Sequence, residues 1–150
     1  MIRRATMDDI EILTNVAEDV LADLPNYASA HVNKDHSRAM LRTFLGLEDL
    51  GCFFEEKDGE IVGLFMAMVH PQWFTPCLEM SELMFWVRKD QRRTSLARDL
   101  LKLAEEWAVS RGAKKLLIAA GSGYETERVV KFYQRYGYEP WSVITCKEVQ

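Results

Sequence analysis

The chain has 150 residues, of which 48% are hydrophobic and 28% charged, a balance typical of a soluble globular protein with one hydrophobic core. It opens without the apolar segment of a signal peptide, and no apolar run approaches the roughly 18 residues that span a bilayer. We therefore expect a single domain over residues 1–150 with no membrane contact. Cys52, Cys77 and Cys146 are widely spaced and odd in number, which predicts free thiols in the cytoplasm and no metal site.

The charge of the chain is unevenly distributed. The formal net charge is −4, which argues against general nucleic-acid binding, because phosphate backbones need a basic surface. Residues 88–98, however, hold five basic residues against Asp90, a local charge of +4, so the rest of the chain carries −8. This contrast predicts one small anion site on an otherwise acidic protein.

The first third of the chain predicts a short strand followed by two helices. Ile2–Ala5 favours a strand. Thr6 and Asp9 have the spacing of a capping box, and apolar residues then recur every three or four positions as far as Pro25, so a helix should lie there. Residues 25–34 predict a loop, and a second helix is expected over residues 35–47.

The rest of the chain predicts an antiparallel hairpin and then alternating helices and strands. Asp58-Gly59 indicates a hairpin between strands over 52–56 and 60–70. Pro71 and Pro76 bracket an expected loop, after which residues 78–87 predict a central strand. A helix, a strand, a helix and a strand are then expected over residues 95–112, 114–120, 125–136 and 141–146. The pattern is mixed α/β.

The start of the helix over 95–112 is a candidate anion site. Neither Thr94 nor Ser95 has an acidic or amide residue three positions on, so no capping box satisfies the first N–H groups of this helix. These donors, the helix dipole and the nearby arginines together make a phosphate cradle. A solvated basic loop with an ordinary Thr or Ser cap fits the same residues equally well.

Two further residues are candidates for chemistry. Glu82 is the most interior charge of the strand over 78–87, and partial burial would raise its pKa toward the range of a general base. A carboxylate at a wet sheet end or paired with an arginine explains it equally. Tyr133 follows Phe132 on the last helix and points about a quarter turn away from it, toward a cleft that Phe132 would not reach. Aromatic residues at helical spacing are otherwise core residues.

At these residues the chain resembles the GNAT superfamily of N-acetyltransferases over essentially its whole length. The family's acetyl-CoA signature, R/Q-x-x-G-x-G/A after the fourth strand, is matched at Arg92 and Ala97, with Ser95 in place of the usual glycine. Its C-terminal motif, FYxxxGF, is matched by Phe132, Tyr133, Gly137 and Tyr138, and Thr126 replaces the asparagine that often opens the last helix.

The resemblance implies a fold and a cofactor. The fold would be a central mixed, mostly antiparallel sheet of about six to seven strands, splayed between the fourth and fifth strands and flanked by about four helices. Acetyl-CoA would be the acetyl donor, with its pantetheine arm on the backbone of Phe85, Trp86 and Val87. Thr126 and Tyr133 would also contact the cofactor, and its pyrophosphate would bind the N–H groups of Arg92, Arg93, Thr94, Ser95, Leu96 and Ala97.

The implied reaction is acetyl transfer to a primary amine of a small molecule or peptide, by direct attack in a ternary complex. Glu82 is the candidate base that accepts the amine proton, and Tyr133 is the candidate acid that protonates the departing thiolate. The acceptor would enter past two loops, one carrying Tyr27 and His31 and the other carrying Trp73 and Phe74.

Other functions remain open. A degenerate GNAT fold could hold CoA as a binding or regulatory module without turnover, which Ser95 and Thr126 favour. Another nucleotide-binding α/β protein fits less well, because neither GxGxxG nor GxxxxGK[ST] occurs. A structural interaction protein would explain exposed Trp73 and Phe74 but not the arginines. A homodimer is left open as a further partner.

Overall fold

The computed structural model describes residues 1–121, 123 and 125–149. Its strands form one sheet in the order β1-β2-β3-β4-β5, antiparallel except for the parallel pair β4 and β5. This confirms the expected mixed α/β fold. The strands are β1 (Arg3–Arg4), β2 (Leu50–Lys57), β3 (Glu60–Gln72), β4 (Thr75–Val87) and β5 (Lys115–Leu117), and the helices are α1 (Ile10–Ala22), α2 (Lys34–Leu45), α3 (Leu96–Ser110) and α4 (Thr126–Gln134).

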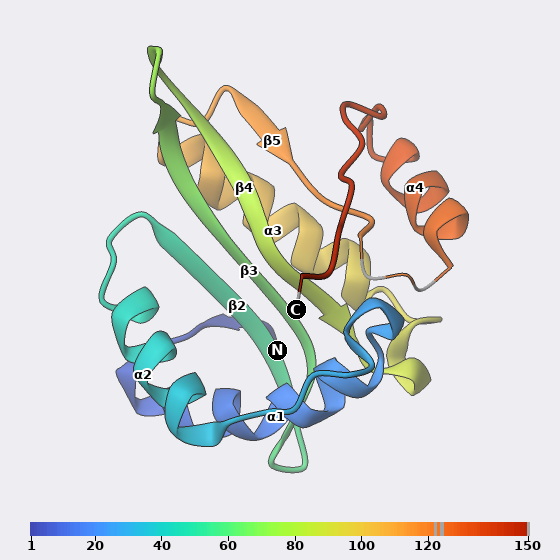
Figure 1. Cartoon of the computed structure of the whole chain (residues 1–150). Helices are drawn as coiled ribbons and strands as arrows, with labels where there is room; N and C mark the ends of the chain where they lie inside the picture. Colours follow the sequence, from blue (N-terminus) through green and yellow to red (C-terminus); the bar gives the residue numbers. More distant parts are fainter. Residues whose placement is uncertain (122, 124, 150) are drawn as a thin grey trace.

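Helices cover both faces of the sheet, and each face has its own core (Figure 1). On one face, α1 places Leu13, Val16 and Val20 against apolar residues of β2, β3 and β4. On the other face, α3 and α4 pack on the sheet through residues such as Leu100 and Tyr133. No helix in the described part of the chain is long and apolar enough to cross a bilayer.

The hairpin between β3 and β4 is longer than expected. The two strands pair as far as Gln72 and Thr75, so Trp73 and Phe74 alone form the turn. The prediction of a loop between Pro71 and Pro76 is therefore wrong. Both prolines fit inside the strands because β2 pairs with β3 only up to Met68, and β5 pairs with β4 only from Glu79. The missing N–H of each proline therefore breaks no backbone hydrogen bond to β2 or to β5.

β4 contains a bulge at Leu83. Met66 pairs with Met84 while the next residue of β3, Ala67, pairs with Glu82, which leaves Leu83 as an extra residue in β4. Cross-strand partners share a face, so Glu82 lies on the side of Ala67, the face covered by α3. The bulge therefore turns the Glu82 side chain to the same face as Phe85.

The expected final strand over residues 141–146 is absent among the described residues, which leaves five strands where six to seven were expected. β5 is also shorter than the expected 114–120 and ends at Leu117, so it offers only a short edge for another strand. The terminal segment contacts β5 where Lys115 Nζ lies 4.6 Å from the ring centre of Trp141.

Close packing between β3 and α3 depends on Gly63. A Cβ atom added there would lie 2.8 Å from Leu96 Cδ2 and 2.9 Å from Leu100 Cδ1, and both leucines are buried. We therefore expect Gly63→Ala to lower the free energy of unfolding by about 1–3 kcal/mol, as overpacked cores do. Urea unfolding checks this, with Gly121→Ala as the control because nothing lies within 4 Å of an added Cβ there. Equal stability of the two variants would contradict it.

Candidate active site

Glu82 and Tyr133, the two predicted catalytic residues, both bond to the backbone of Ala119. The Ala119 N–H donates to Glu82 Oε2 at 3.2 Å, and the Tyr133 hydroxyl lies 3.5 Å from the Ala119 carbonyl oxygen, to which it donates. Glu82 comes from β4, Tyr133 from α4, and Ala119 follows β5. Three elements far apart in sequence thus bring a carboxylate and a phenol together.

Burial changes the acidity of both groups. It raises the pKa of the Glu82 carboxyl above its ordinary value, an effect that the hydrogen bond from Ala119 only partly offsets. Burial, with the nearby charge of Glu82 adding to it, also raises the pKa of the Tyr133 hydroxyl, whose side chain is 8% exposed. Near neutral pH, Tyr133 therefore keeps its proton, and Glu82 is a stronger base than an ordinary carboxylate.

The two catalytic candidates lie where β4 and β5 separate. β5 pairs with Glu79, Met80 and Ser81 and then ends, whereas β4 continues to Val87. Beyond Ser81, the β5 side of β4 has no strand partner among the described residues, which confirms the expected splay. The backbone of Phe85, Trp86 and Val87, expected to hold the pantetheine arm, forms this open edge, and the Phe85 ring stacks 6.3 Å from that of Tyr133.

Some of the backbone N–H groups expected to bind phosphate are unbonded at the beginning of α3. The Thr94 hydroxyl accepts from the Leu96 N–H at 3.2 Å, so a side-chain cap exists for that donor. The Ser95 hydroxyl instead donates to Asp99. Among the described residues the Ala97 and Arg98 N–H groups make no hydrogen bond, so these donors are available to an anion.

The basic segment 88–98 does not present its full charge to solvent. Arg88 pairs with Asp90 and Glu60, and Arg98 pairs with Asp99. Lys89 and Arg92 share Asp23, whose carboxylate is 3.1 Å from Lys89 Nζ and 2.7 Å from Arg92 Nη2. The local +4 is therefore largely balanced by carboxylates within the segment and around it. Arg93 is exposed and has no ion-pair partner among the described residues.

A second group of basic residues, not identified from the sequence, lies on α4. A cavity of about 690 Å³ lies between Arg92 and α4 and includes Thr126. Four basic residues line it against two glutamates, which leaves two positive charges. The spacing of Arg128, Lys131 and Arg135, three and then four positions apart, places them on one helical face and could have indicated this surface. The basic residues are Arg92, Arg128, Lys131 and Arg135, and the acidic ones Glu125 and Glu127.

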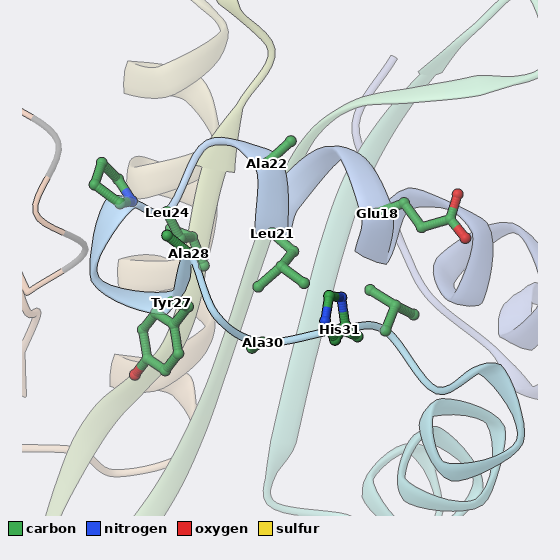
Figure 2. Close-up of a pocket in the computed structure, with 10 residues that line it drawn as sticks. Glu18, Leu21, Ala22, Leu24, Tyr27, Ala28, Ala30 and His31 are labelled. Atoms are coloured by element: carbon green, nitrogen blue, oxygen red, sulfur yellow. The ribbon is translucent and has the colours of Figure 1, made fainter. Parts of the chain in front are cut away.

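The loop between α1 and α2 forms a second cavity, of about 580 Å³, which contains the predicted substrate residues Tyr27 and His31. Figure 2 shows Leu21 of α1 projecting toward the loop segment that carries these two side chains. Glu18 adds a carboxylate to the lining. The cavity thus combines an aromatic ring, an imidazole and a negative charge.

Trp73 and Phe74 do not join the predicted site. They form the tip of the β3–β4 hairpin, which extends beyond the rest of the sheet (Figure 1), and their side chains are 93% and 68% exposed. At about 3.3 Å per residue, the eight residues from Phe74 to Glu82 span about 26 Å along β4. Their ring centres lie 5.4 Å apart, so the two rings contact each other at the tip of the hairpin.

The fold also occurs in solved acetyltransferases. An aminoglycoside acetyltransferase from an uncultured soil metagenomic sample is 19% identical, with a TM-score of 0.76 over 100% of this chain and 98% of that one. The glucosamine-6-phosphate N-acetyltransferase of Arabidopsis thaliana is 15% identical, with a TM-score of 0.78 over 100% and 98%. The aminoglycoside N-acetyltransferase AAC(6')-Iy in complex with CoA is 16% identical, with a TM-score of 0.74 over 100% and 94%.

The sheet separates between its fourth and fifth strands, and a carboxylate and a phenol lie beside the opening. The model of the acetyltransferase (GNAT) family matches residues 16–138. The chain therefore belongs to the GNAT acetyltransferase family. No curated protein sequence matches it.

Proposed function

We propose that the protein is an acetyl-CoA-dependent N-acetyltransferase that moves an acetyl group to a primary amine of a small molecule or peptide. The observation that carries the proposal is that Glu82 and Tyr133 both bond to the backbone of Ala119, where β4 and β5 separate. Such a pair supplies a base for an incoming amine and an acid for a departing thiolate in one place.

The residues around the opening suit CoA. Its pyrophosphate and 3′-phosphate need positive charge and N–H donors, which the basic cavity beside α4 and the first N–H groups of α3 supply. Its pantetheine arm carries amides, which suit the open backbone edge of β4 over residues 85–87. Arg92, Arg128, Lys131 and Arg135 would hold the phosphates, and the CoA complex of AAC(6')-Iy supports this choice of donor.

The chemistry is a direct transfer in a ternary complex. An alkyl ammonium has a pKa of about 10.4, so the acceptor must lose a proton before its nitrogen attacks the thioester carbonyl carbon. Glu82 takes that proton, directly or through water. The new C–N bond forms as the C–S bond breaks, and Tyr133 gives its proton to the sulfur. The nitrogen then loses its remaining extra proton, which restores the neutral Tyr133 phenol.

The cavity beside the loop between α1 and α2 is the candidate acceptor site. The ring of Tyr27 suits a cationic amine, as does the carboxylate of Glu18, for which such an amine would compete with Lys34, 3.5 Å away. The structural relatives named above act on aminoglycosides and glucosamine-6-phosphate, which are amino sugars. We therefore place amino sugars first among the small-molecule acceptors to be tested.

The test measures binding and turnover separately. Calorimetric titration with acetyl-CoA measures the first, and thiol release over a panel of amino sugars, polyamines and peptides measures the second. We expect acetyl-CoA to bind and at least one amine to release CoA. Binding without release from any amine would favour the CoA-binding module, and the absence of binding would overturn the proposal.

The basic face of α4 gives a specific prediction. The double variant Arg128→Ala and Lys131→Ala should weaken CoA binding more than tenfold, because each charged contact to a phosphate contributes about 1.5–3 kcal/mol. Arg42→Ala is the matched control, an exposed arginine on α2 that lines neither cavity. Equal affinity of the double variant and wild type would remove α4 from the cofactor site.

A further inference from the structure

Asp23 connects three segments at the entrance to the proposed cofactor site. It follows the last residue of α1, and its carboxylate accepts from Trp86 Nε1 at 3.0 Å and from Arg92 Nη2 at 2.7 Å. Lys89 Nζ lies 3.1 Å from its other oxygen. The Asp23 side chain is only 10% exposed, so one buried carboxylate holds the end of β4 and the segment leading into α3 against the end of α1.

Asp23 is charged in the folded protein. Burial acts to raise its pKa, but hydrogen bonds from Trp86 and Lys89 and the charge of Arg92 outweigh it and leave the pKa below its ordinary value. Near neutral pH, the carboxylate is therefore a permanent partner of the two cations.

Asp23 reaches the cofactor site through Arg92. Arg92 Nε donates to the Val87 carbonyl oxygen at 2.7 Å while Nη2 binds Asp23, so two contacts fix the orientation of one planar guanidinium. Arg92 also lines the basic cavity beside α4, and Asp23 does not. Asp23 thus contacts Arg92, which would bind the phosphates, without itself lining the cavity.

We propose that Asp23 is a positioning residue of the cofactor site. It fixes the guanidinium of Arg92 so that the basic cavity meets a pyrophosphate in one arrangement. This inference rests on the proposed function and deepens it. The carboxylate repels a nearby phosphate by charge, but the order that it gives to the Arg92 guanidinium outweighs that repulsion.

The experiment compares donors with and without phosphates. Asp23→Asn keeps the shape of the side chain but removes its charge, and we expect it to weaken CoA binding about tenfold, the effect of one charge-assisted hydrogen bond. S-acetylpantetheine lacks the pyrophosphate, so its kcat/KM should stay within about twofold of wild type, as should kcat at saturating acetyl-CoA. A general loss of structure would impair both donors equally and would overturn the inference.

Two further variants make the comparison decisive. Asp19→Asn is the matched control, because Asp19 is an exposed α1 carboxylate with no partner among the described residues. In Asp23→Asn combined with Arg92→Gln, CoA affinity should fall no further than in Arg92→Gln alone, because Asp23 acts through Arg92. Additive losses would overturn the inference, as would unchanged or tighter CoA binding in Asp23→Asn.

The charge-conserving variant Asp23→Glu provides the same test if Asp23→Asn does not fold. It displaces the carboxylate by one methylene, so we expect a smaller loss with acetyl-CoA and none with S-acetylpantetheine. A wild-type protein that binds no CoA would overturn the proposed function and this inference together. Wild-type binding with an unaffected Asp23→Asn would overturn this inference alone.

Discussion

Tyr133→Phe should lower kcat by about a hundredfold or more, the usual contribution of a positioned acid, while CoA affinity changes little. The hydroxyl is the only atom lost, and its hydrogen bond to Ala119, at 3.5 Å, is long and weak. Its removal therefore costs little structure but removes the proton meant for the thiolate. Steady-state kinetics at saturating acetyl-CoA, with a titration of CoA binding alongside, measure both effects.

Tyr136→Phe is the matched control for this experiment. Tyr136 lies just past the end of α4, its side chain is 41% exposed, and its ring contacts Phe132 rather than the reaction centre. Loss of its hydroxyl should leave kcat at the wild-type value. An unchanged kcat in Tyr133→Phe as well would remove Tyr133 from the mechanism.

Glu82→Gln should abolish the acid limb of the pH profile and lower kcat by about a hundredfold at neutral pH. The base works as a carboxylate, so kcat in the wild type falls as pH drops through the pKa of Glu82. Burial raises that pKa, so the limb lies above pH 4.5, the ordinary value for a glutamate. A pH profile of kcat for both proteins measures the change, and identical profiles would exclude Glu82 as the base.

The stability of Glu82→Gln separates catalysis from folding. A carboxyl whose pKa is raised on folding stabilises the protein below its unfolded pKa, and this contribution is lost as pH rises through the folded pKa. The variant should therefore be at least as stable as wild type near neutral pH. Glu79→Gln, on the same strand but bonded to Gln72, is the matched control and should keep the acid limb.

Local sequence patterns predicted the order of helices and strands, but they did not predict which strands pair with each other. The Asp58-Gly59 turn and the apolar spacing of α1 and α3 depend on neighbours in sequence, and the structure contains all three elements. The segment over 141–146 has a strand-like composition, but a strand also needs an edge to pair with. β5 provides only three residues, and composition does not reveal that length.

The same distinction applies to the site. The sequence indicates Glu82 as a charge inside an apolar strand and Tyr133 as part of a family motif. In the structure both side chains bond to the backbone of Ala119. The charge count over residues 88–98 overstated the anion site, because Asp23, which balances two of its cations, lies about 65 residues earlier in the chain. Pairing at that distance is a property of the fold.

The extra residue at Leu83 decides whether the side chains of Glu82 and Phe85 lie on the same face of the sheet. Residues 82 and 85 are an odd number of positions apart, so a regular strand would send their side chains to opposite faces, and only the bulge brings Glu82 to the side of Phe85 and Tyr133. A deletion of Leu83 would place Glu82 and Phe85 an even number of positions apart, so regular pairing would keep both side chains on this face without a bulge. The face on which Glu82 lies therefore depends on how the backbone accommodates Leu83 as an extra residue, and not on which side chain stands at that position.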